Sequence, residues 1–356
     1  MRVCILGGNL SSLTLAKALV NQKIFVDVFG YFKSNSLNQT RTLGISKSNV
    51  DFFNKNIINI NKIIWKIKRI EILSDKLKNK KMINFNASSE YLFSIVSNYK
   101  LYNILKISLE KNKYFKNKNL NLKKNFIEEY DLVINTDYSN SITKKYFSKN
   151  IVKKYNSYAF TTVIHHKRIL NNTATQIFTK NGPLAFLPIS ENKTSIVYSA
   201  HNFENKKNKN IKELIQNNNL KYKIKKIEKI SFVELKGANL RSYYHKNILA
   251  FGDLLHKIHP LAGQGFNMTI RDIKNLILII NNKMALGLPL DYSVNSEFEK
   301  KFKDKNFIFS SGINFIHEFF NLERKTKNTF ISKSVHFLGQ NFKINKMFVK
   351  IADEGL

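Results

Sequence analysis

A glycine-rich stretch in the last third of the chain holds the residues whose types and spacing could do chemistry. It runs from Gly252 to Asn267, after an apolar run typical of a buried strand and before a helical pattern over Met268 to Ile280. A helix N-terminus offers free backbone N–H groups and partial positive charge, and Gly263 and Gly265 let the backbone approach a ligand closely. Asp253 can accept hydrogen bonds from sugar hydroxyls. The stretch therefore predicts a site for a nucleotide-type cofactor.

The N-terminus predicts the layer that must position such a cofactor. A strand over Arg2 to Leu6 is followed by a turn, a helix that ends near Asn21, and a strand over Ile24 to Phe29. Dinucleotide-binding folds begin with this β-α-β order. An ordinary β-α-β unit without a ligand has the same order, so this segment alone leaves both interpretations open.

The glycine fingerprint of the N-terminal turn is incomplete. Only Gly7 fits the G-x-G-x-x-G pattern, because Asn9 and Ser12 replace the other two glycines. We expect Asn9 to accept a positive φ angle, and the small Ser12 to let the helix lie close to the strand. Gly30 stands where an acidic residue would hold the ribose.

An antiparallel sheet is predicted between the two glycine-containing segments. Apolar runs between Ser157 and Ala200 indicate strands, with a turn at Asn181-Gly182-Pro183. A sheet lobe over the cofactor crevice would suit substrate binding. The remainder reads as helices, at Ser293 to Phe320 with a break near Gly312, at Glu323 to Leu338, and at Phe342 to Ala352.

Composition limits the classes of partner. The 356 residues carry a formal net charge of +34, which would suit nucleic acid or an anionic membrane. Lysine is spread along the whole chain rather than gathered in one arm, so we interpret the charge as composition drift and expect no nucleic-acid partner. The single Cys4 excludes an intrachain disulfide and a cysteine-based metal cluster.

No signal peptide and no apolar run long enough for a membrane span are expected, so a cytoplasmic location is predicted. The segment Phe342 to Ala352 has apolar residues at helical spacing, flanked by lysines. Such a helix could lie on the inner membrane as a peripheral contact. The interpretation we favour is that its apolar face packs on its own domain.

The whole chain resembles the FAD-dependent aromatic hydroxylases, and within them the branch that acts in ubiquinone biosynthesis. Two further segments are similar to that branch, at Arg41 to Ser46 and at Gly182 to Pro188. The segment Asn135 to Lys144 departs from the family pattern, because it keeps Asp137 and Ser141 but lacks both glycines and the arginine. The family's second flavin motif is matched at Gly252, Asp253, His256, Pro260, Gly263, Gln264, Gly265, Asn267 and Asp272.

The resemblance implies an α/β fold, with a Rossmann-like FAD-binding domain, an inserted antiparallel sheet for the substrate, and C-terminal helices. The expected division is 1–150 for the first FAD-binding part, 151–240 for the sheet lobe, 241–290 for the second FAD motif, and 291–356 for the helices. The residues that the resemblance assigns to FAD are Gly7, Gly8, Asn9, Ser11, Arg41, Gly252, Asp253, Pro260, Gly263, Gln264, Gly265, Phe266 and Asn267.

The implied function is hydroxylation of the ring of a polyprenylated phenol in ubiquinone biosynthesis, with O₂ and a flavin C4a-hydroperoxide. Electrons would come from reduced nicotinamide or another donor. The flavin carries the chemistry, so no catalytic acid or base is singled out, and no metal site is expected. Two alternatives stay open: another flavoprotein oxidoreductase, such as a prenyl reductase or a hydroxylase of soluble aromatic compounds, and a degenerate non-catalytic member of a quinone-biosynthesis complex.

Overall fold

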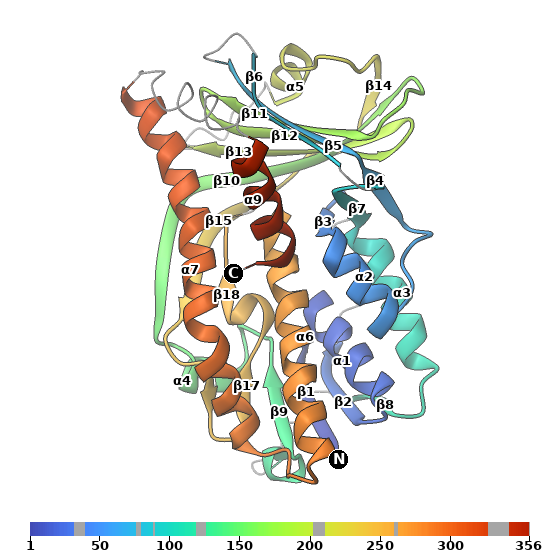
Figure 1. Cartoon of the computed structure of the whole chain (residues 1–356), viewed down its shortest axis with the longest axis vertical. Helices are drawn as coiled ribbons and strands as arrows, with labels where there is room; N and C mark the ends of the chain where they lie inside the picture. The colour runs from blue at the N-terminus through green and yellow to red at the C-terminus, as the bar shows by residue number, and fades with distance from the viewer. Residues whose placement is uncertain are drawn as a thin grey trace.

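The structure is a computed structural model that describes residues 1–31, 40–75, 80–87, 90–118, 126–201, 211–259, 263–326 and 342–355. Pro260 and most of the predicted helix Glu323 to Leu338 lie outside the described residues. A parallel sheet lies at one end and a large antiparallel sheet at the other, with long helices running between them (Figure 1).

The parallel sheet has the strand order β16-β17-β9-β1-β2-β8, and its pairs are parallel except for β16 with β17. After β1 the chain builds β2 and β8 on one side, then β9 and β17 on the other. This reversal of direction is a topological switch point. Open α/β sheets bind ligands at such a point, next to the carboxyl ends of the strands. The strands are β1 (Arg2–Gly8), β2 (Phe25–Tyr31), β8 (Phe115–Lys118), β9 (Leu132–Asn135), β16 (Tyr244–His245) and β17 (Ile248–Ala250).

Helices complete the core around this sheet. Apolar residues of β1 and β9 are fully buried, as expected for parallel strands covered on both faces. Leu13, Leu101 and Ile273 bring three helices into the same core. These are α1 (Leu10–Asn21), α3 (Asn98–Glu110) and α6 (Gln264–Ala285), and the short α4 (Ser141–Tyr146) follows β9.

The predicted antiparallel lobe is a sheet in the order β18-β15-β10-β13-β12-β11-β5-β6, in which β5 pairs parallel to β11 and β14 pairs with β10. Two of its strands, β5 and β6, come from the predicted 1–150 segment. The helix α5 (Ile211–Asn217) packs Ile215 against this sheet. The strands are β5 (Arg69–Ser74), β6 (Lys80–Asn86), β10 (Asn150–His166), β11 (Thr173–Thr179), β12 (Gly182–Ser190), β13 (Lys193–His201), β14 (Ile224–Ile227), β15 (Ser231–Leu240) and β18 (His256–Lys257).

Two local expectations are wrong. The turn before β12 is at Lys180 and Asn181, while Gly182 already pairs with Thr179 in the ladder. The helix α7 (Tyr292–Thr326) runs without a break through Gly312. A helical glycine costs only about 1 kcal/mol, and the burial of Phe309 and Ile313 on either side offsets it.

A small sheet and the last helix complete the fold. The strands β3 (Thr42–Ser46), β7 (Phe93–Ser97) and β4 (Ile64–Ile67) pair in that order, and α2 (Lys47–Asn56) follows β3 directly. The helix α9 (Phe342–Glu354) lies beneath the large sheet, between α7 and α2 (Figure 1). Its Ile351 packs against the cluster of Met268, Phe309 and Ile313. Met347, on the same expected apolar face, is exposed, so packing of the whole face on its own domain stays a prediction.

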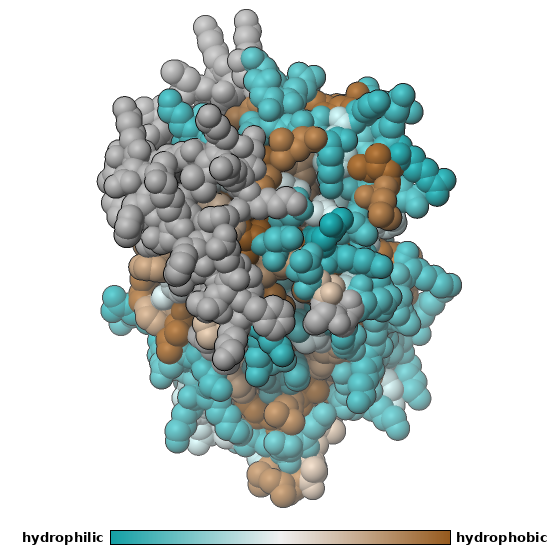
Figure 2. Space-filling model, turned by 45° about the horizontal axis from the view of Figure 1, so that its top comes forward, coloured by the Kyte–Doolittle hydropathy of each residue, from teal (hydrophilic) through white to brown (hydrophobic). Residues whose placement is uncertain are grey.

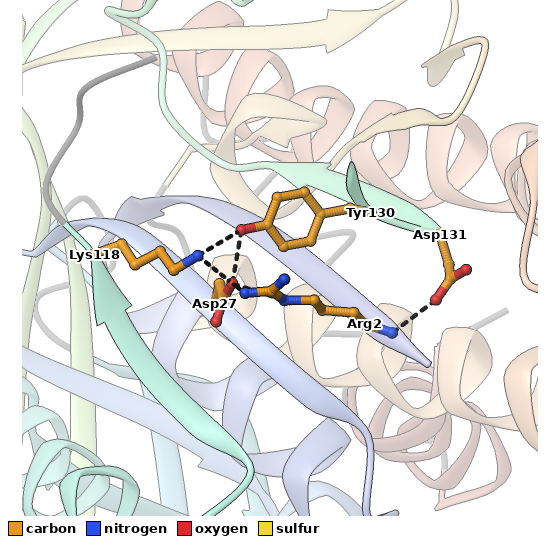
Figure 3. A network of polar contacts seen from close by, with 5 residues as sticks. All are labelled: Arg2, Asp27, Lys118, Tyr130 and Asp131. Atoms are coloured by element: carbon orange, nitrogen blue, oxygen red, sulfur yellow. Dashed lines mark hydrogen bonds and ion pairs between the residues drawn. The ribbon is translucent and has the colours of Figure 1, made fainter. Parts of the chain in front are cut away.

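A buried carboxylate ties three strands of the parallel sheet, β1, β2 and β8, to the segment that leads into β9 (Figure 3). The Asp27 carboxylate accepts from the Tyr130 hydroxyl at 2.7 Å and pairs with Arg2 at 2.8 Å and Lys118 at 2.9 Å. Burial by itself would raise the pKa of Asp27, but these donors and cations hold it below its usual value. Asp27 pairs with Cys4 inside the sheet, before the carboxyl end of β2, so it does not replace the ribose-binding acid.

Candidate functional site

The turn between β1 and α1 is the first part of the predicted site. Gly7 has a φ of +112°, and a Cβ there would lie 2.3 Å from the Thr136 hydroxyl oxygen. Asn9 has a φ of −83° and is the N-cap of α1, where its side chain accepts from the Ser12 amide at 3.0 Å. The expected positive φ at Asn9 is therefore wrong, because the residue caps the helix in an extended conformation.

Thr136, directly after β9, links this turn to the other side of the switch point. Its hydroxyl donates to the Leu6 carbonyl at 3.0 Å and lies 2.7 Å from the Ser12 hydroxyl. The Asn9 amide donates to the Thr136 carbonyl at 3.1 Å. The two residues that replace glycines of the fingerprint, Asn9 and Ser12, thus bond to the strand end that departs from the family pattern.

The second motif meets the first at Gly252. Its φ is +64°, and a Cβ there would lie 2.9 Å from the Ser11 Cβ. Asp253 follows, exposed at the carboxyl end of β17. The Tyr138 hydroxyl donates to the Asp253 carbonyl. The structure therefore brings Gly7, Ser11 and Asp253 to one edge of the sheet.

The N-terminus of α6 is the second cluster of predicted residues. Gly263 has a φ of +64°, and a Cβ there would lie 3.6 Å from the Gly44 backbone of β3. Asn267 is fully buried, and its amide donates to the carbonyls of Gly44 at 3.0 Å and Gly263 at 3.2 Å. Its oxygen accepts from the Ser46 amide and the Asn49 side chain, both at 2.9 Å. Asn267 therefore clamps the helix start to β3 and α2.

The remaining predicted residues have different surroundings. Phe266 is packed in the main hydrophobic core, and the Cβ position of Gly265 lies 3.9 Å from Ile258, its one neighbour within 4 Å in the part of the chain that the structure describes. Arg41 is exposed immediately before β3, and its carbonyl accepts from the Asn98 amide at 3.0 Å. Gly8 accepts a hydrogen bond from the Tyr102 hydroxyl at 3.2 Å. Their contact with FAD stays a prediction.

A buried histidine–aspartate pair supports this helix from beneath. His256 Nε2 lies 2.5 Å from Asp272 Oδ2, and both side chains are almost fully buried. Asp272 also accepts from the Asn306 side chain of α7 at 3.0 Å. Both residues belong to the matched motif. Their packing explains why the motif needs them at that spacing: they join the strand end, α6 and α7.

The residues present fit a flavin nucleotide. The backbone turns sharply at Gly263, so the first amides of α6 are available to an electron-rich or anionic group. Gln264 Oε1 is buried with no hydrogen-bond partner among the described residues, and can accept from a ring N–H. At the other cluster, the start of α1 and the exposed Asp253 suit a pyrophosphate and a polyol chain, respectively.

Sequence reasoning missed several supporting residues. Gly44 has no room for a side chain, since a Cβ there would lie 1.9 Å from the Phe93 ring. Asn49, Thr136 and Tyr138 bond to motif residues from distant parts of the chain. The resemblance of Arg41 to Ser46 to the quinone branch was the one signal that pointed to this strand.

Comparisons with known proteins agree with this geometry. Residues 150–284 match the family described as FAD binding domain. A segment is 30% identical over 150 residues to 3-demethoxyubiquinol 3-hydroxylase of Escherichia coli (strain K12), which covers 40% of this chain and 38% of that protein. Another is 22% identical over 229 residues to the mitochondrial ubiquinone biosynthesis monooxygenase COQ6 of Drosophila melanogaster, covering 52% and 48%. The matched segments thus span less than half of either relative.

Solved structures confirm the fold class. The p-nitrophenol 4-monooxygenase PnpA from Pseudomonas putida DLL-E4 superposes with a TM-score of 0.81, at 10% identity, over 99% of this chain and 98% of that one. Klebsiella pneumoniae HpxO complexed with FAD and uric acid superposes with a TM-score of 0.68, at 12% identity, over 99% and 93%.

The expected cofactor, FAD, is confirmed by the family match.

Within the described ranges, no group of histidine, cysteine and acidic side chains could hold a metal ion. None of the described helices is both long and apolar enough to cross a bilayer.

Proposed function

We propose that this chain is an FAD-dependent aromatic hydroxylase, and that it hydroxylates the ring of a polyprenylated phenol in ubiquinone biosynthesis. The observation that carries the proposal is the N-terminus of α6, where Asn267 clamps a turned backbone against β3. Such a rigid, amide-lined helix start is suited to the ring end of a flavin. The names of the relatives from Escherichia coli and Drosophila melanogaster support the choice of pathway.

FAD, when bound, supplies the chemistry that activates O₂ and transfers one oxygen atom. The role of the chain is to hold and enclose the reactants. The α6 amides, Gly263 and Gln264 would orient the ring end, while Ser11, Gly252 and Asp253 would hold the phosphate and polyol part. The large sheet and α7 would exclude water above the ring.

An apolar cluster beside α6 supports a substrate with a hydrocarbon tail. Met268, Phe309 and Ile313 are buried together, with Phe178 of the large sheet and Ile258 packed against them. Ile258 and Met268 stand on either side of the glycine turn in sequence. A prenyl chain could take over the contacts that these side chains now make with one another.

The pathway is tested by profiling quinone intermediates in a strain that lacks this chain. We expect a polyprenylated phenol that lacks one ring hydroxyl to accumulate, and to disappear when the chain is restored. Purified protein should also be yellow and should release flavin on denaturation. An unchanged quinone profile would exclude the proposed pathway, whereas colourless protein that takes up no added FAD would exclude the flavin chemistry itself.

One observation favours a second candidate, a non-catalytic member of a biosynthetic complex. Thr136 and Tyr138 stand in the segment where the family has glycines, and both form hydrogen bonds with residues that would meet FAD. Asp253→Ala separates the two candidates. If wild type and variant form equal amounts of hydroxylated product, Asp253 has no role in flavin binding. If a variant that binds no flavin restores quinone synthesis, the chain acts as a non-catalytic member of the complex.

We also propose a weak peripheral contact with an anionic membrane, because a net charge of +34 attracts anionic lipid even where it arises from composition drift. On the face shown in Figure 2, apolar side chains form separate patches within a hydrophilic surface. Attachment through the part of this face that is coloured in the figure would therefore depend mainly on charge. Co-sedimentation with anionic vesicles should be lost at high salt, and binding that persists in high salt or occurs equally on neutral vesicles would contradict an electrostatic contact.

A further inference from the structure

The C-terminal end of α9 sits on the corner between β3 and α2, beside the start of α6. The Asp353 carboxylate accepts from the Ser48 amide at 2.9 Å, and so caps α2 from another part of the chain. The Asp353 carbonyl accepts from the hydroxyls of Ser48 at 2.9 Å and Ser46 at 3.0 Å. These three bonds attach α9 to the structure through one residue.

The same corner supports the flavin-ring end of the proposed site. Ser46 uses its hydroxyl for Asp353 and its amide for Asn267 Oδ1, at 2.9 Å. Two residues before Asp353, Ile351 packs on the apolar cluster of Met268, Phe309 and Ile313. The end of α9 therefore covers the space where a substrate tail would lie.

The guanidinium of Arg271 lies next to this end of α9, and both of its terminal nitrogens are buried without a hydrogen-bond partner among the described residues. The guanidinium stacks on the Phe309 ring at 4.3 Å, and a Cβ at Gly355 would lie 2.7 Å from its Nη1. Burial lowers the pKa of Arg271 to about 10, with Asp272 and Asp353 opposing the change, so the group is still charged at neutral pH.

A buried donor without a partner costs free energy, and a charged one costs more. The closed position of α9 thus combines three latch bonds with an unfavourable contact under the helix end. Movement of this end would return Arg271 to solvent and uncover the apolar cluster. Such an arrangement suits a lid, because the cost of the unpaired cation offsets part of the stabilisation from the three latch bonds.

We propose that the C-terminal end of α9 is a lid, latched by Asp353 on Ser46 and Ser48, that opens to admit the hydrophobic part of the substrate to the flavin-ring end of the site. The proposal rests on the proposed function for the identity of the ligand. The movement itself depends only on the contacts of α9.

A disulfide between the latch residues tests the lid. The double variant Ser48→Cys/Asp353→Cys replaces two residues that are in direct contact, and Cys4, the chain's one natural cysteine, is buried and its pKa is raised by that burial. The probe is dodecylphenol in detergent, added to the FAD-loaded protein, and binding is followed by the change in flavin absorbance. We expect the association rate to fall by about ten-fold or more on oxidation and to recover on reduction.

The single variants Ser48→Cys and Asp353→Cys are the controls and should not respond to oxidant. If the disulfide fails to form, Asp353→Ala provides the opposite test, because it removes the α2 cap and should raise the association rate. Equal rates in the oxidised and reduced double variant, together with an unchanged rate in Asp353→Ala, would overturn the lid.

Hydrogen exchange separates failure of the lid from failure of the proposed function, because it needs neither flavin nor substrate. The amides of residues 46–50 and 349–355 should exchange about ten-fold more slowly in the oxidised double variant than in the reduced form. If that result is obtained with a protein that binds no flavin, it would support the lid and contradict the proposed function. Equal exchange in both forms would contradict the lid whatever the chemistry.

Discussion

Gly252 and Gly287 have nearly the same backbone conformation in very different surroundings. Their φ angles are +64° and +67°, but a Cβ at Gly252 would meet Ser11 at 2.9 Å, while no atom of the described residues lies within 4 Å of one at Gly287. The strain of a left-handed alanine is common to both sites, at about 1–2 kcal/mol. The difference between the two variants therefore isolates the contact between the two motifs.

We expect Gly252→Ala to lower FAD affinity by about ten-fold or more, because Ser11 must move away and the start of α1 moves with it. Gly287→Ala should lose only the strain energy and bind FAD normally. Fluorescence titration with FAD and denaturant unfolding measure the two effects. Equal FAD affinity in both variants would show that the Ser11 contact has no part in the site.

At the scale of elements, the Asn267 side chain joins α6 to β3 and α2 through three hydrogen bonds. Leucine would leave the Gly44 carbonyl and the Ser46 amide without partners, at about 1–3 kcal/mol for each buried group. We expect Asn267→Leu to be destabilised and to release flavin while it is still folded. Flavin absorbance after gel filtration measures the release.

Asn171 provides the matched control for Asn267. It is also fully buried and hydrogen-bonded, to Ser190 and Thr194, but it lies in the large sheet lobe. Asn171→Leu should lower stability to a similar extent without loss of flavin under native conditions. Flavin release from both variants would mean that general loosening, not the clamp, controls cofactor binding.

The Asp27 network predicts a pH dependence of stability. The folded pKa of Asp27 lies below its usual value. Its carboxylate therefore contributes fully to the free energy of unfolding above about pH 4, and that contribution is lost as the pH falls through the lowered folded pKa. We expect Asp27→Asn to lose about 1–3 kcal/mol at neutral pH. Denaturant unfolding at several pH values should show the difference from wild type shrinking below about pH 4.

Asp131→Asn is the control for this network. Asp131 accepts from the Arg2 backbone amide at 2.7 Å but is itself exposed. Its replacement should cost less than about 1 kcal/mol. If the two variants lose the same stability, burial does not determine the strength of the Asp27 contacts.

At the scale of the whole molecule, the proposed cofactor would contact both the parallel sheet and the β3–α6 junction. A ligand that binds only the folded chain raises the free energy of unfolding by about 2.7 kcal/mol at one hundred times its Kd. We expect the thermal midpoint of flavin-stripped protein to rise steadily with added FAD. Riboflavin, which lacks the phosphates and adenosine, should raise it less. A midpoint that FAD leaves unchanged would contradict the assigned site.

Local sequence patterns predicted the order of the elements correctly but failed at two positions. Local apolar patterns predicted the order of β1, α1 and β2. Short apolar runs separated by turn residues predicted the antiparallel sheet lobe. The break expected at Gly312 was wrong because a local propensity of about 1 kcal/mol is smaller than the packing of a long helix. The positive φ expected at Asn9 was wrong because a capping hydrogen bond determines its conformation.

The sequence by itself determined the β-α-β order at the N-terminus and a glycine-rich turn that leads into a helix, since these depend on residue types at fixed, short spacings. Only the tertiary structure decided which distant residues complete the site. Thr136 meets Asn9, Ser46 meets Asn267, and Asp353 meets Ser48 across long stretches of chain. Such bonds depend on how sheets and helices pack. The residues that form them are far apart in the sequence, and no local pattern indicates that they will meet.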